Sequence, residues 1–373
     1  MTSNVRVIAL YLPQFHPVPD NDHWWGKGFT EWTNVGKARP LFRGHYQPHI
    51  PADLGYYDLR LPEARESQAD LAKAYGVEGF MYWHYWFGNG KQLLERPFQE
   101  VLRSGKPDFP FCLAWANESW KGFAHGLTNR NVLIEQQYPG DEDYTNHFYS
   151  VLPAFKDKRY ITVDGKPVFM IYKPHLHPDL VHFIGLWRQL AKQNGLKDIY
   201  FIAHHQSCKE QGRTEEESFK YFIDKGFNAV NYVRLSTFLE QRNLFQRGIA
   251  KWNKIFKGVP LVYPYQKVAK YFNSPLDSNL NVIPSIIPGW DHTPRSQKEG
   301  LVLKDSTPSL FEEHVHSIFE SIKEKPLEHR IVFIKSWNEW AEGNYMEPDL
   351  KWGCGYLEAL RRQLKSNNDS HNE

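Results

Sequence analysis

The chain has 373 residues, 41% of them hydrophobic, which is enough for a sizeable core in one large domain or two ordinary ones. Its formal net charge of +2 gives no indication of the broad electrostatic attraction to nucleic acid that strongly basic proteins show. The three scattered cysteines, Cys112, Cys208 and Cys354, indicate neither a disulfide framework nor a cysteine-based zinc motif.

The N-terminus passes directly into a strand pattern. Residues 1–15 contain no charged segment leading into a long apolar run and no cleavage signal. We therefore expect no signal peptide, no membrane span and a cytoplasmic location, although a chain trimmed of its leader would look the same.

A strand candidate and a long loop open the chain. Residues 5–12 are the first strand candidate, and the loop at 17–60 has aromatic residues spaced too irregularly for an amphipathic helix. A loop of this length is uncommon unless it has a function, and the alternative is that its aromatic residues form a small core beneath it. After it we expect, in chain order, a helix at 62–75, a strand at 77–83, a helix at 92–103 that Pro97 weakens, a strand at 111–115 and a helix at 144–155.

The same alternation continues to the C-terminus. We expect strands at 167–172, 199–203, 228–232, 282–287 and 331–337, with helices over 180–191, 219–223, 311–322 and 356–364. Residues from 234 to about 280 stand apart as an insertion, with a basic stretch at 234–274 in which we expect helices.

Eight strand candidates, most of them followed by helical sequence, predict a single (β/α)8 TIM barrel over residues 1–373 with long βα loops. The strands are short and mostly apolar, as parallel strands covered on both faces should be. A doubly wound open sheet is the alternative. It would require a glycine-rich phosphate loop after the first strand, where the sequence is LPQFHP.

The candidate catalytic residues are Glu339 and Glu342, three residues apart just past the last strand candidate. Trp337 and Trp340 surround them, and Asn338 lies beside them. Aromatic-rich carboxylate pairs at strand ends are typical of barrel glycosidases, because two carboxyl groups supply acid and base and indole rings stack on sugars. An isolated E-x-x-E pair is more often a solvated helix face, so the strand and the tryptophans are what favour a catalytic site. An indole-lined pocket should also raise the pKa of one of the two carboxyl groups.

Polar and aromatic residues follow several other strand candidates, and each has an ordinary structural explanation when taken alone. In a barrel the carboxyl ends of the strands form one rim, so we expect these residues around a shared pocket. The predicted substrate-binding residues are Gln14, His16, Trp24, Trp25, Glu31, Trp32, His84, Trp86, Asn117, Glu118, Trp120, His204, Trp290, Asp291 and Asn338. Glu118 is also a reserve candidate for the acid.

The histidines support a metal site only weakly. His204 and His205 are adjacent, and His175 and His177 are one residue apart, but no H-E-x-x-H and no H-x-H at the end of the first strand accompanies them. We expect no metal and no cofactor, and hydrogen bonding to substrate or core for these histidines.

Six stretches of the chain resemble the WbsX-type domain, which is related to glycoside hydrolase family 99. They are ALYLPQFHP at 9–17, WWGKGFTEWTNV at 24–35, GHYQPHIPADLGYYDLR at 44–60, HYWF at 84–87, LAWANESW at 113–120 and SWNEWAEGNYMEPD at 336–349. The resemblance covers almost the whole chain. It implies a (β/α)8 fold and action on a bacterial surface polysaccharide such as O-antigen or capsule.

The resemblance also implies a mechanism. Family 99 contains endo-acting α-mannosidases that retain configuration through a 1,2-anhydro sugar, and their W-N-E-W-x-E-G motif matches residues 337–343. Carried over, Glu339 is the base that assists the substrate 2-hydroxyl, and Glu342 protonates the leaving oxygen and then activates water. Ala341 stands where family 99 commonly has His, and the N-terminal region resembles WbsX domains more than mannosidases, so the identity of the sugar stays open.

The sequence thus predicts a metal-independent, endo-acting glycoside hydrolase whose substrate is an oligosaccharide or polysaccharide. One alternative is a polysaccharide-binding or assembly protein that uses the barrel as a lectin. The other is a glycosyl-transferring enzyme of polysaccharide biosynthesis. The lack of a D-x-D motif at a strand end argues against a metal-dependent transferase.

Overall fold

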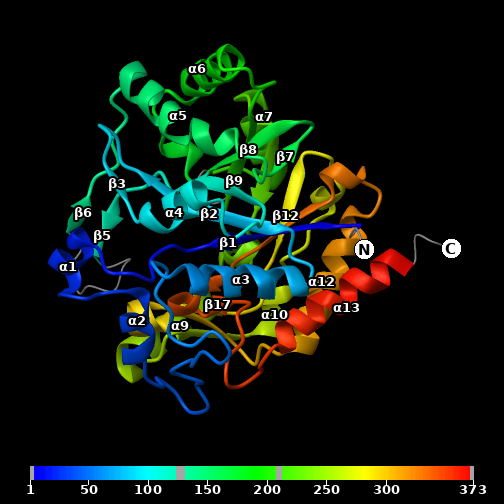
Figure 1. Ribbon diagram of the computed structural model, residues 1–373. Coiled ribbons are helices and arrows are strands. Elements are labelled where there is room, and N and C mark those ends of the chain that lie inside the picture. The colour runs from blue at the N-terminus through cyan, green and yellow to red at the C-terminus, as the bar shows by residue number, and fades with distance from the viewer. Residues whose placement is uncertain (1–3, 123–130, 207–211, 370–373) are drawn as a thin grey trace.

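Eight parallel strands close into a barrel in a computed structural model that describes residues 4–122, 131–206 and 212–369 (Figure 1). In chain order they are β1 (Arg6–Tyr11), β2 (Gly79–Trp86), β4 (Phe111–Trp115), β8 (Lys166–Ile171), β9 (Tyr200–His205), β10 (Ala229–Tyr232), β12 (Val282–Ile286) and β15 (Ile331–Ile334). Each pairs in parallel with the next, and β15 pairs with β1 to close the ring. The predicted (β/α)8 barrel is confirmed. Every residue of β2 and β4 is buried, as expected for parallel strands covered on both faces.

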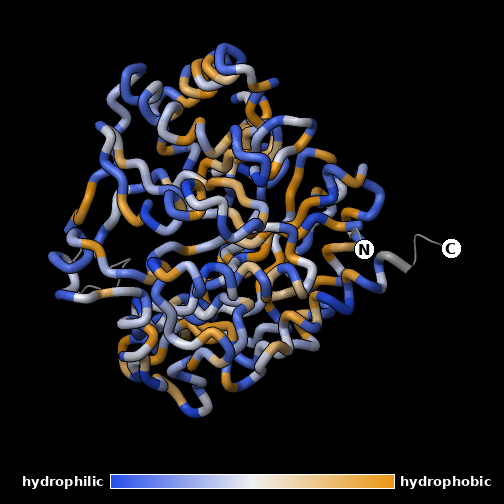
Figure 2. Tube along the Cα trace, viewed as in Figure 1, coloured by the Kyte–Doolittle hydropathy of each residue, from blue (hydrophilic) through white to orange (hydrophobic). Residues whose placement is uncertain are grey.

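The helices surround this barrel. They include α3 (Pro62–Ala74), α4 (Arg96–Ser104), α5 (Asp141–Phe155), α6 (Leu180–Gln193), α7 (Glu215–Asp224), α12 (Pro308–Ile322) and α13 (Gly355–Asp369). Figure 2 shows hydrophobic and hydrophilic residues alternating along them, and α6 buries its predicted apolar stripe against the strands. Within the described ranges, no helix combines the length and apolar character needed to cross a membrane. Cys112 and Cys354 are free thiols, and Cys208 lies outside the described residues.

The expectation that residues 17–60 lack helices is wrong. Two seven-residue helices form there, α1 (Pro19–Trp25) and α2 (Glu31–Lys37). Both depend on local start signals rather than on a long apolar stripe: a proline lies in the first turn of α1, and the N–H of Thr30 bonds the Thr33 hydroxyl at the start of α2. Helices this short show no periodicity that a sequence pattern could detect.

The helix predicted at 92–103 begins later than expected. Gln92–Leu93 form strand β3, which pairs antiparallel with the end of β2, and α4 starts at Arg96. Pro97 lies in the first turn of α4, where its missing N–H is not needed, so it starts this helix rather than weakening it.

The insertion after β10 forms helices, as expected, and also a strand. It contains α8 (Thr237–Glu240), α9 (Leu244–Lys257), β11 (Leu261–Pro264) and α10 (Tyr265–Ala269). Strand β11 pairs with β14 (Leu301–Lys304), which pairs in turn with β13 (Trp290–Asp291). A second small core, with Phe238, Tyr265 and Phe272, lies beneath this sheet. The insertion therefore packs beside residues that follow β12 at the barrel rim.

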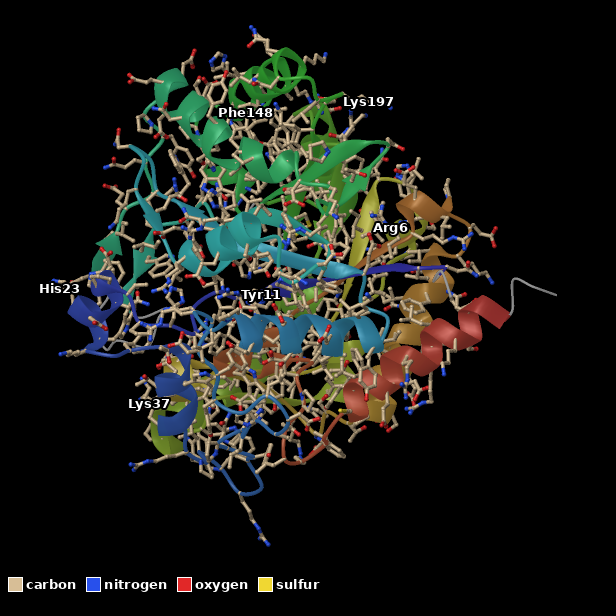
Figure 3. All side chains as sticks on the ribbon, viewed as in Figure 1. Arg6, Tyr11, His23, Lys37, Phe148 and Lys197 are labelled. Carbon is tan, nitrogen blue, oxygen red and sulfur yellow. The ribbon has the colours of Figure 1, made fainter. Side chains whose placement is uncertain are left out.

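Figure 3 labels both ends of β1, with Arg6 at its amino end and Tyr11 at its carboxyl end. The carboxyl end points toward α1 and α2, on which His23 and Lys37 are labelled. The rim formed by the carboxyl ends of the strands is thus the side covered by the long N-terminal loop.

Candidate active site

A cavity of about 610 Å³ lies at the carboxyl ends of the barrel strands. Its lining comes from segments at or after the ends of seven strands: Leu12, Gln14, Trp83, Tyr85, Ala116, Glu118, Ser119, Trp120, Lys121, Tyr172, Leu176, Gln206, Trp290, His292, Arg295, Lys335, Glu339 and Glu342. Five of these are tryptophans or tyrosines, so aromatic rings wall a cavity whose remaining lining is mostly polar.

The two glutamates enter this cavity from a tight turn. Glu339 ends β16 (Asn338–Glu339), Glu342 ends a short 3₁₀ turn, and the chain returns through β17 (Asn344–Tyr345). Gly343 closes the turn with φ of 61°, and a Cβ there would lie 2.6 Å from the backbone nitrogen of Asp291. A glycine is required at this position because both the conformation and the space exclude a side chain.

Arg295 organises the carboxylates. It comes from α11 (Thr293–Ser296), and its side chain is 8% exposed. Its Nη1 donates to Glu342 Oε1 at 2.5 Å, while its Nη2 lies 3.0 Å from Glu31 Oε2 and 3.4 Å from Glu339 Oε2. One guanidinium thus bridges three acidic side chains, of which Glu31 and Glu339 are buried and Glu342 is partly exposed. Sequence reasoning missed Arg295, since the run TPRS matches no catalytic pattern.

Two further groups approach Glu342. Lys335 Nζ lies 3.8 Å from Glu342 Oε2 and 5.4 Å from the centre of the Trp290 ring. His292 Nε2 lies 3.7 Å from Glu342 Oε1, and burial lowers the pKa of His292. Both residues were missed. Lys335 carried a usable signal, because a lysine directly after a buried apolar strand is unusual.

These surroundings separate the pKa values of the two glutamates. Burial and the nearby charge of Glu342 raise the pKa of Glu339 to about 7. Burial also disfavours ionised Glu342, but the positive charges of Arg295 and Lys335 outweigh it and lower the pKa of that carboxyl. Near neutral pH Glu339 is therefore still protonated in a large share of the molecules while Glu342 is ionised, which is the combination that acid–base chemistry requires.

Six of the predicted site residues line the cavity. They are the catalytic candidates Glu339 and Glu342 and the predicted binding residues Gln14, Glu118, Trp120 and Trp290. The structure brings them together from the ends of β1, β4, β12 and β15, as the barrel prediction required.

Glu31 and Asn338 lie behind the lining rather than in it. Glu31 is buried and pairs with Arg295. Asn338 accepts a hydrogen bond from the Leu12 N–H at 2.7 Å and donates to the Leu12 carbonyl at 3.0 Å. Glu31 therefore holds the guanidinium of Arg295, and Asn338 ties the segment after β15 to the end of β1.

His84 and Trp86 face away from the cavity. Both lie within β2, which is longer than predicted, and side chains alternate along a strand, so Trp83 and Tyr85 face the cavity instead. His84 Nε2 is 2.9 Å from His147 Nε2, and Trp86 Nε1 donates to Asp143 Oδ2 at 3.1 Å. Burial lowers the pKa of His84 to about 4, which keeps it neutral against α5.

Three more predicted residues are held by neighbouring segments outside the lining. His204 Nδ1 contacts Asn231 Oδ1 at 2.7 Å, and Asn117 Nδ2 donates to the Lys173 carbonyl at 2.9 Å. Asp291 accepts a hydrogen bond from Gln47 at 2.7 Å, lies 2.7 Å from His45 Nε2, and so fastens the long N-terminal loop. Among the described residues, no group of three or more His, Cys, Asp and Glu side chains is arranged to hold a metal ion.

The predicted aromatic residues of the long loop form a supporting layer. Trp24 and Trp25 pack around Trp120, with ring centres 5.9 and 6.4 Å away. Trp32 packs on Trp340 at 5.5 Å. His16 lies 3.0 Å from the Pro13 carbonyl through its Nδ1 and is buried. These contacts agree with the alternative explanation, that the aromatic residues of the loop form a small core beneath it.

Comparison with known proteins gives a family and two groups of relatives. A family model described as "Glycosyltransferase WbsX" matches residues 7–360. Two relatives named "Uncharacterized protein WxcX", from Xanthomonas campestris pv. campestris strains B100 and ATCC 33913, are each 36% identical over 365 residues. The alignment covers 97% of this chain and 50% of each relative, so the chain spans about half their length.

Solved structures share the fold. The GH99 endo-α-mannosidase from Bacteroides thetaiotaomicron aligns over 100% of both chains with a TM-score of 0.60 and 14% identity. A protein described as "Glycoside hydrolase-like protein" aligns over 97% of this chain and 94% of its own with a TM-score of 0.56 and 15% identity.

Proposed function

We propose that this chain, which belongs to the WbsX family, is a carbohydrate-active enzyme that cleaves glycosidic bonds within a polysaccharide. The observation that carries the proposal is the pair of glutamates in one aromatic-walled cavity, with their pKa values shifted in opposite directions. Glycosidases use two carboxyl groups in this way, and tryptophan and tyrosine rings offer flat apolar surfaces on which sugar rings stack.

Hydrolysis is the reaction that the charges favour. The family is described as glycosyltransferases, whereas the solved structures with this fold include a GH99 endo-α-mannosidase. A transferase that uses a nucleotide sugar must hold a diphosphate. Of the cavity cations, Arg295 instead lies against Glu31 and Glu342, and Lys335 lies against Glu342, so the charge of these two side chains is already balanced by carboxylates.

The space around the glutamates supports an endo-acting hydrolase. Trp290, His292 and Lys335 also line an adjoining cavity of about 270 Å³, whose other walls include Leu235 and Leu239. A saccharide chain bound at the glutamates thus has room to continue beyond them. We propose a bacterial surface polysaccharide as the substrate, on the basis of the family to which the chain belongs.

We assign the proton donor to Glu339 and the base to Glu342. Glu339 holds a proton near neutral pH and can pass it to the leaving oxygen as the glycosidic bond breaks. Glu342 is ionised and can accept the proton of the substrate 2-hydroxyl as that oxygen attacks the anomeric carbon, once the hydroxyl displaces a hydrogen bond from Arg295. Deprotonated Glu339 then takes a proton from the water that opens the anhydro sugar, and Glu342 returns its proton to the 2-oxygen. This order is the reverse of the roles that the resemblance to family 99 implies.

One experiment tests the activity and its dependence on both glutamates. Purified O-antigen and capsular polysaccharides are incubated with the wild type, Glu339→Gln and Glu342→Gln, and new reducing ends are measured. We expect release by the wild type and a loss of about 10²–10⁴-fold in each variant. Full activity in both variants would contradict the proposal.

The roles are separated with a cleavable glycosyl fluoride of the same sugar, whose leaving group needs little protonation. We expect Glu339→Gln to retain activity on the fluoride and Glu342→Gln to lose it; the opposite pattern would restore the roles implied by the resemblance. Polysaccharide binding without any product would indicate a lectin, and calorimetric binding of a nucleotide sugar would indicate a transferase.

A further inference from the structure

Helix α9 (Leu244–Lys257) presents an uncovered apolar face. Its large apolar side chains are between 46% and 84% exposed: Leu244, Phe245, Ile249, Trp252, Ile255 and Phe256. At 3.6 residues per turn these six positions fall on one side of the helix, and the four lysine and arginine residues of α9 fall on the other.

The orientation of α9 is the reverse of the usual one. A surface helix normally turns its apolar face to the core, but α9 has no buried residue, and its half-buried side chains are Arg247, Ala250, Asn253 and Lys254. Arg247 Nη2 donates to the Glu240 carbonyl at 3.3 Å, and Lys254 forms an ion pair with Glu299. Polar contacts therefore hold the helix, and its apolar face points away from the protein.

The surrounding charge is strongly asymmetric. Residues 241–276 contain seven lysine and arginine residues and no aspartate or glutamate, whereas the whole chain has 45 basic and 43 acidic residues. Lys251 and Lys257 are exposed and lie at the two edges of the apolar face. A tryptophan- and phenylalanine-rich face bordered by lysines is the pattern of helices that lie in the interface of an anionic membrane.

We propose that α9 docks this protein on the surface of a bilayer containing anionic phospholipids. The apolar face enters the boundary between headgroups and acyl chains, and Lys251 and Lys257 contact lipid phosphates. Fourteen residues make a helix of about 21 Å, which is shorter than the hydrocarbon core, so α9 lies along the membrane rather than across it.

Docking through α9 brings the active-site side of the barrel to the membrane. Figure 1 draws α9 on the side of the molecule toward which the carboxyl end of β1 points. Glu299, its ion-pair partner, lines the cavity that adjoins the glutamates. If the proposed function holds, polysaccharides anchored in the membrane are presented to the active site; the docking itself does not depend on that function.

The test is flotation of the full chain with vesicles of phosphatidylglycerol and phosphatidylethanolamine in equal parts, compared with vesicles of phosphatidylcholine alone. We expect flotation with the anionic vesicles that weakens as salt is added. The double variant Trp252→Glu/Phe256→Glu and the charge variant Lys251→Glu/Lys257→Glu should each lower the bound fraction by about tenfold. Val181→Glu on α6, 53% exposed in the wild type, is the matched control and should float like the wild type.

Each alternative has a distinct outcome. Wild-type protein that stays unbound to the anionic vesicles, or equal flotation of all variants, would overturn the proposal. A dimer in sedimentation velocity that Trp252→Glu/Phe256→Glu converts to a monomer, without vesicle binding, would show that a second copy of the chain covers this face. A wild-type protein that floats with the anionic vesicles but cleaves no polysaccharide would contradict only the proposed function.

Discussion

The positive charge of Arg295 contacts three acidic side chains of the candidate site, Glu31, Glu339 and Glu342. Arg295→Met removes this charge at similar volume and leaves Glu31, which is almost fully buried, without its cation. We expect a loss of about 3–5 kcal/mol in the free energy of unfolding. Denaturant titration measures it.

The control for this variant is Arg362→Met on α13. Arg362 pairs with Glu312 at 2.6 Å, but its side chain is 54% exposed. Removing an exposed ion pair should cost no more than about 1 kcal/mol. Similar costs for the two variants would show that Arg295 does not stabilise the buried carboxylates.

The pH dependence of a Lys335 variant tests whether Glu339 is the proton donor. Its positive charge lowers the pKa of Glu339, which burial has raised to about 7. Replacing Lys335 by Met removes that effect, so the pKa of Glu339 rises and the proton stays bound to a higher pH. We expect the alkaline limb of the kcat/KM profile to start near pH 7 in the wild type and to move upward in Lys335→Met.

Lys121→Met is the matched control, since Lys121 also lines the cavity but is exposed and is not among the main charges that shift Glu339. Its profile should match that of the wild type. An alkaline limb that stays in place in Lys335→Met would show that Glu339 is not the group responsible for it.

Sequence reasoning located the glutamate pair but not the side chains that control it. The pair was accessible because Glu339 and Glu342 directly follow a strand and carry a family motif. His84 and Trp86 were assigned to the site because the predicted strand ended at Trp83, whereas the actual strand continues and alternates. Arg295 could not be found, because its position beside the glutamates depends on how separate loops fold together.

At the scale of elements, the turn between β16 and β17 sets where Glu342 points. Gly343→Ala would put a methyl group 2.6 Å from the Asp291 nitrogen, at a φ of 61° that side chains disfavour. The turn must shift, so we expect a loss of about 1–3 kcal/mol in the free energy of unfolding. We also expect kcat to fall in the folded variant, because the shift displaces Glu342. Thermal unfolding and single-turnover kinetics measure the two effects.

Gly353→Ala is the control that measures the cost of the backbone conformation without the cost of a steric clash. Gly353 has a φ of 50°, but a Cβ there would meet nothing within 4 Å. We expect the conformational cost alone, about 1 kcal/mol, with kcat unchanged. If Gly343→Ala behaves in the same way, the close approach to Asp291 does not position Glu342.

The elements that sequence patterns predicted best are those with strong burial. The strands and long helices such as α6 and α12 appear within a few residues of their expected bounds, because their apolar residues pack on the barrel. Helices α1 and α2 escaped prediction because capping residues and a proline define them rather than an apolar stripe. Local hydrogen bonds of this kind give no signal at the scale of a periodic pattern.

At the scale of the whole molecule, the described residues form two cores that a buried arginine connects. The larger core fills the barrel, and the smaller one lies in the insertion. Arg234, at the junction, donates to Asp277 Oδ1 at 2.7 Å within the insertion and to Glu215 Oε1 at 2.5 Å at the start of α7. Burial already raises the pKa of Asp277 although Arg234 opposes the shift, so this carboxyl depends on the guanidinium to stay ionised.

We predict that Arg234→Met uncouples the insertion from the barrel. Amide hydrogen exchange should accelerate in α8, α10 and β11, which carry the smaller core, while the barrel strands keep their protection. Arg159→Met removes an equally buried arginine that pairs with Asp157 and bonds the Pro107 and Val101 carbonyls, and it should accelerate exchange around α4 and the start of β4 instead. Uniform acceleration across all strands in Arg234→Met would show that the two cores unfold as one cooperative unit. In that case α9, the proposed docking helix, could not move relative to Glu339 and Glu342 without unfolding the barrel, and the proposed membrane contact and catalysis would share a single rigid frame.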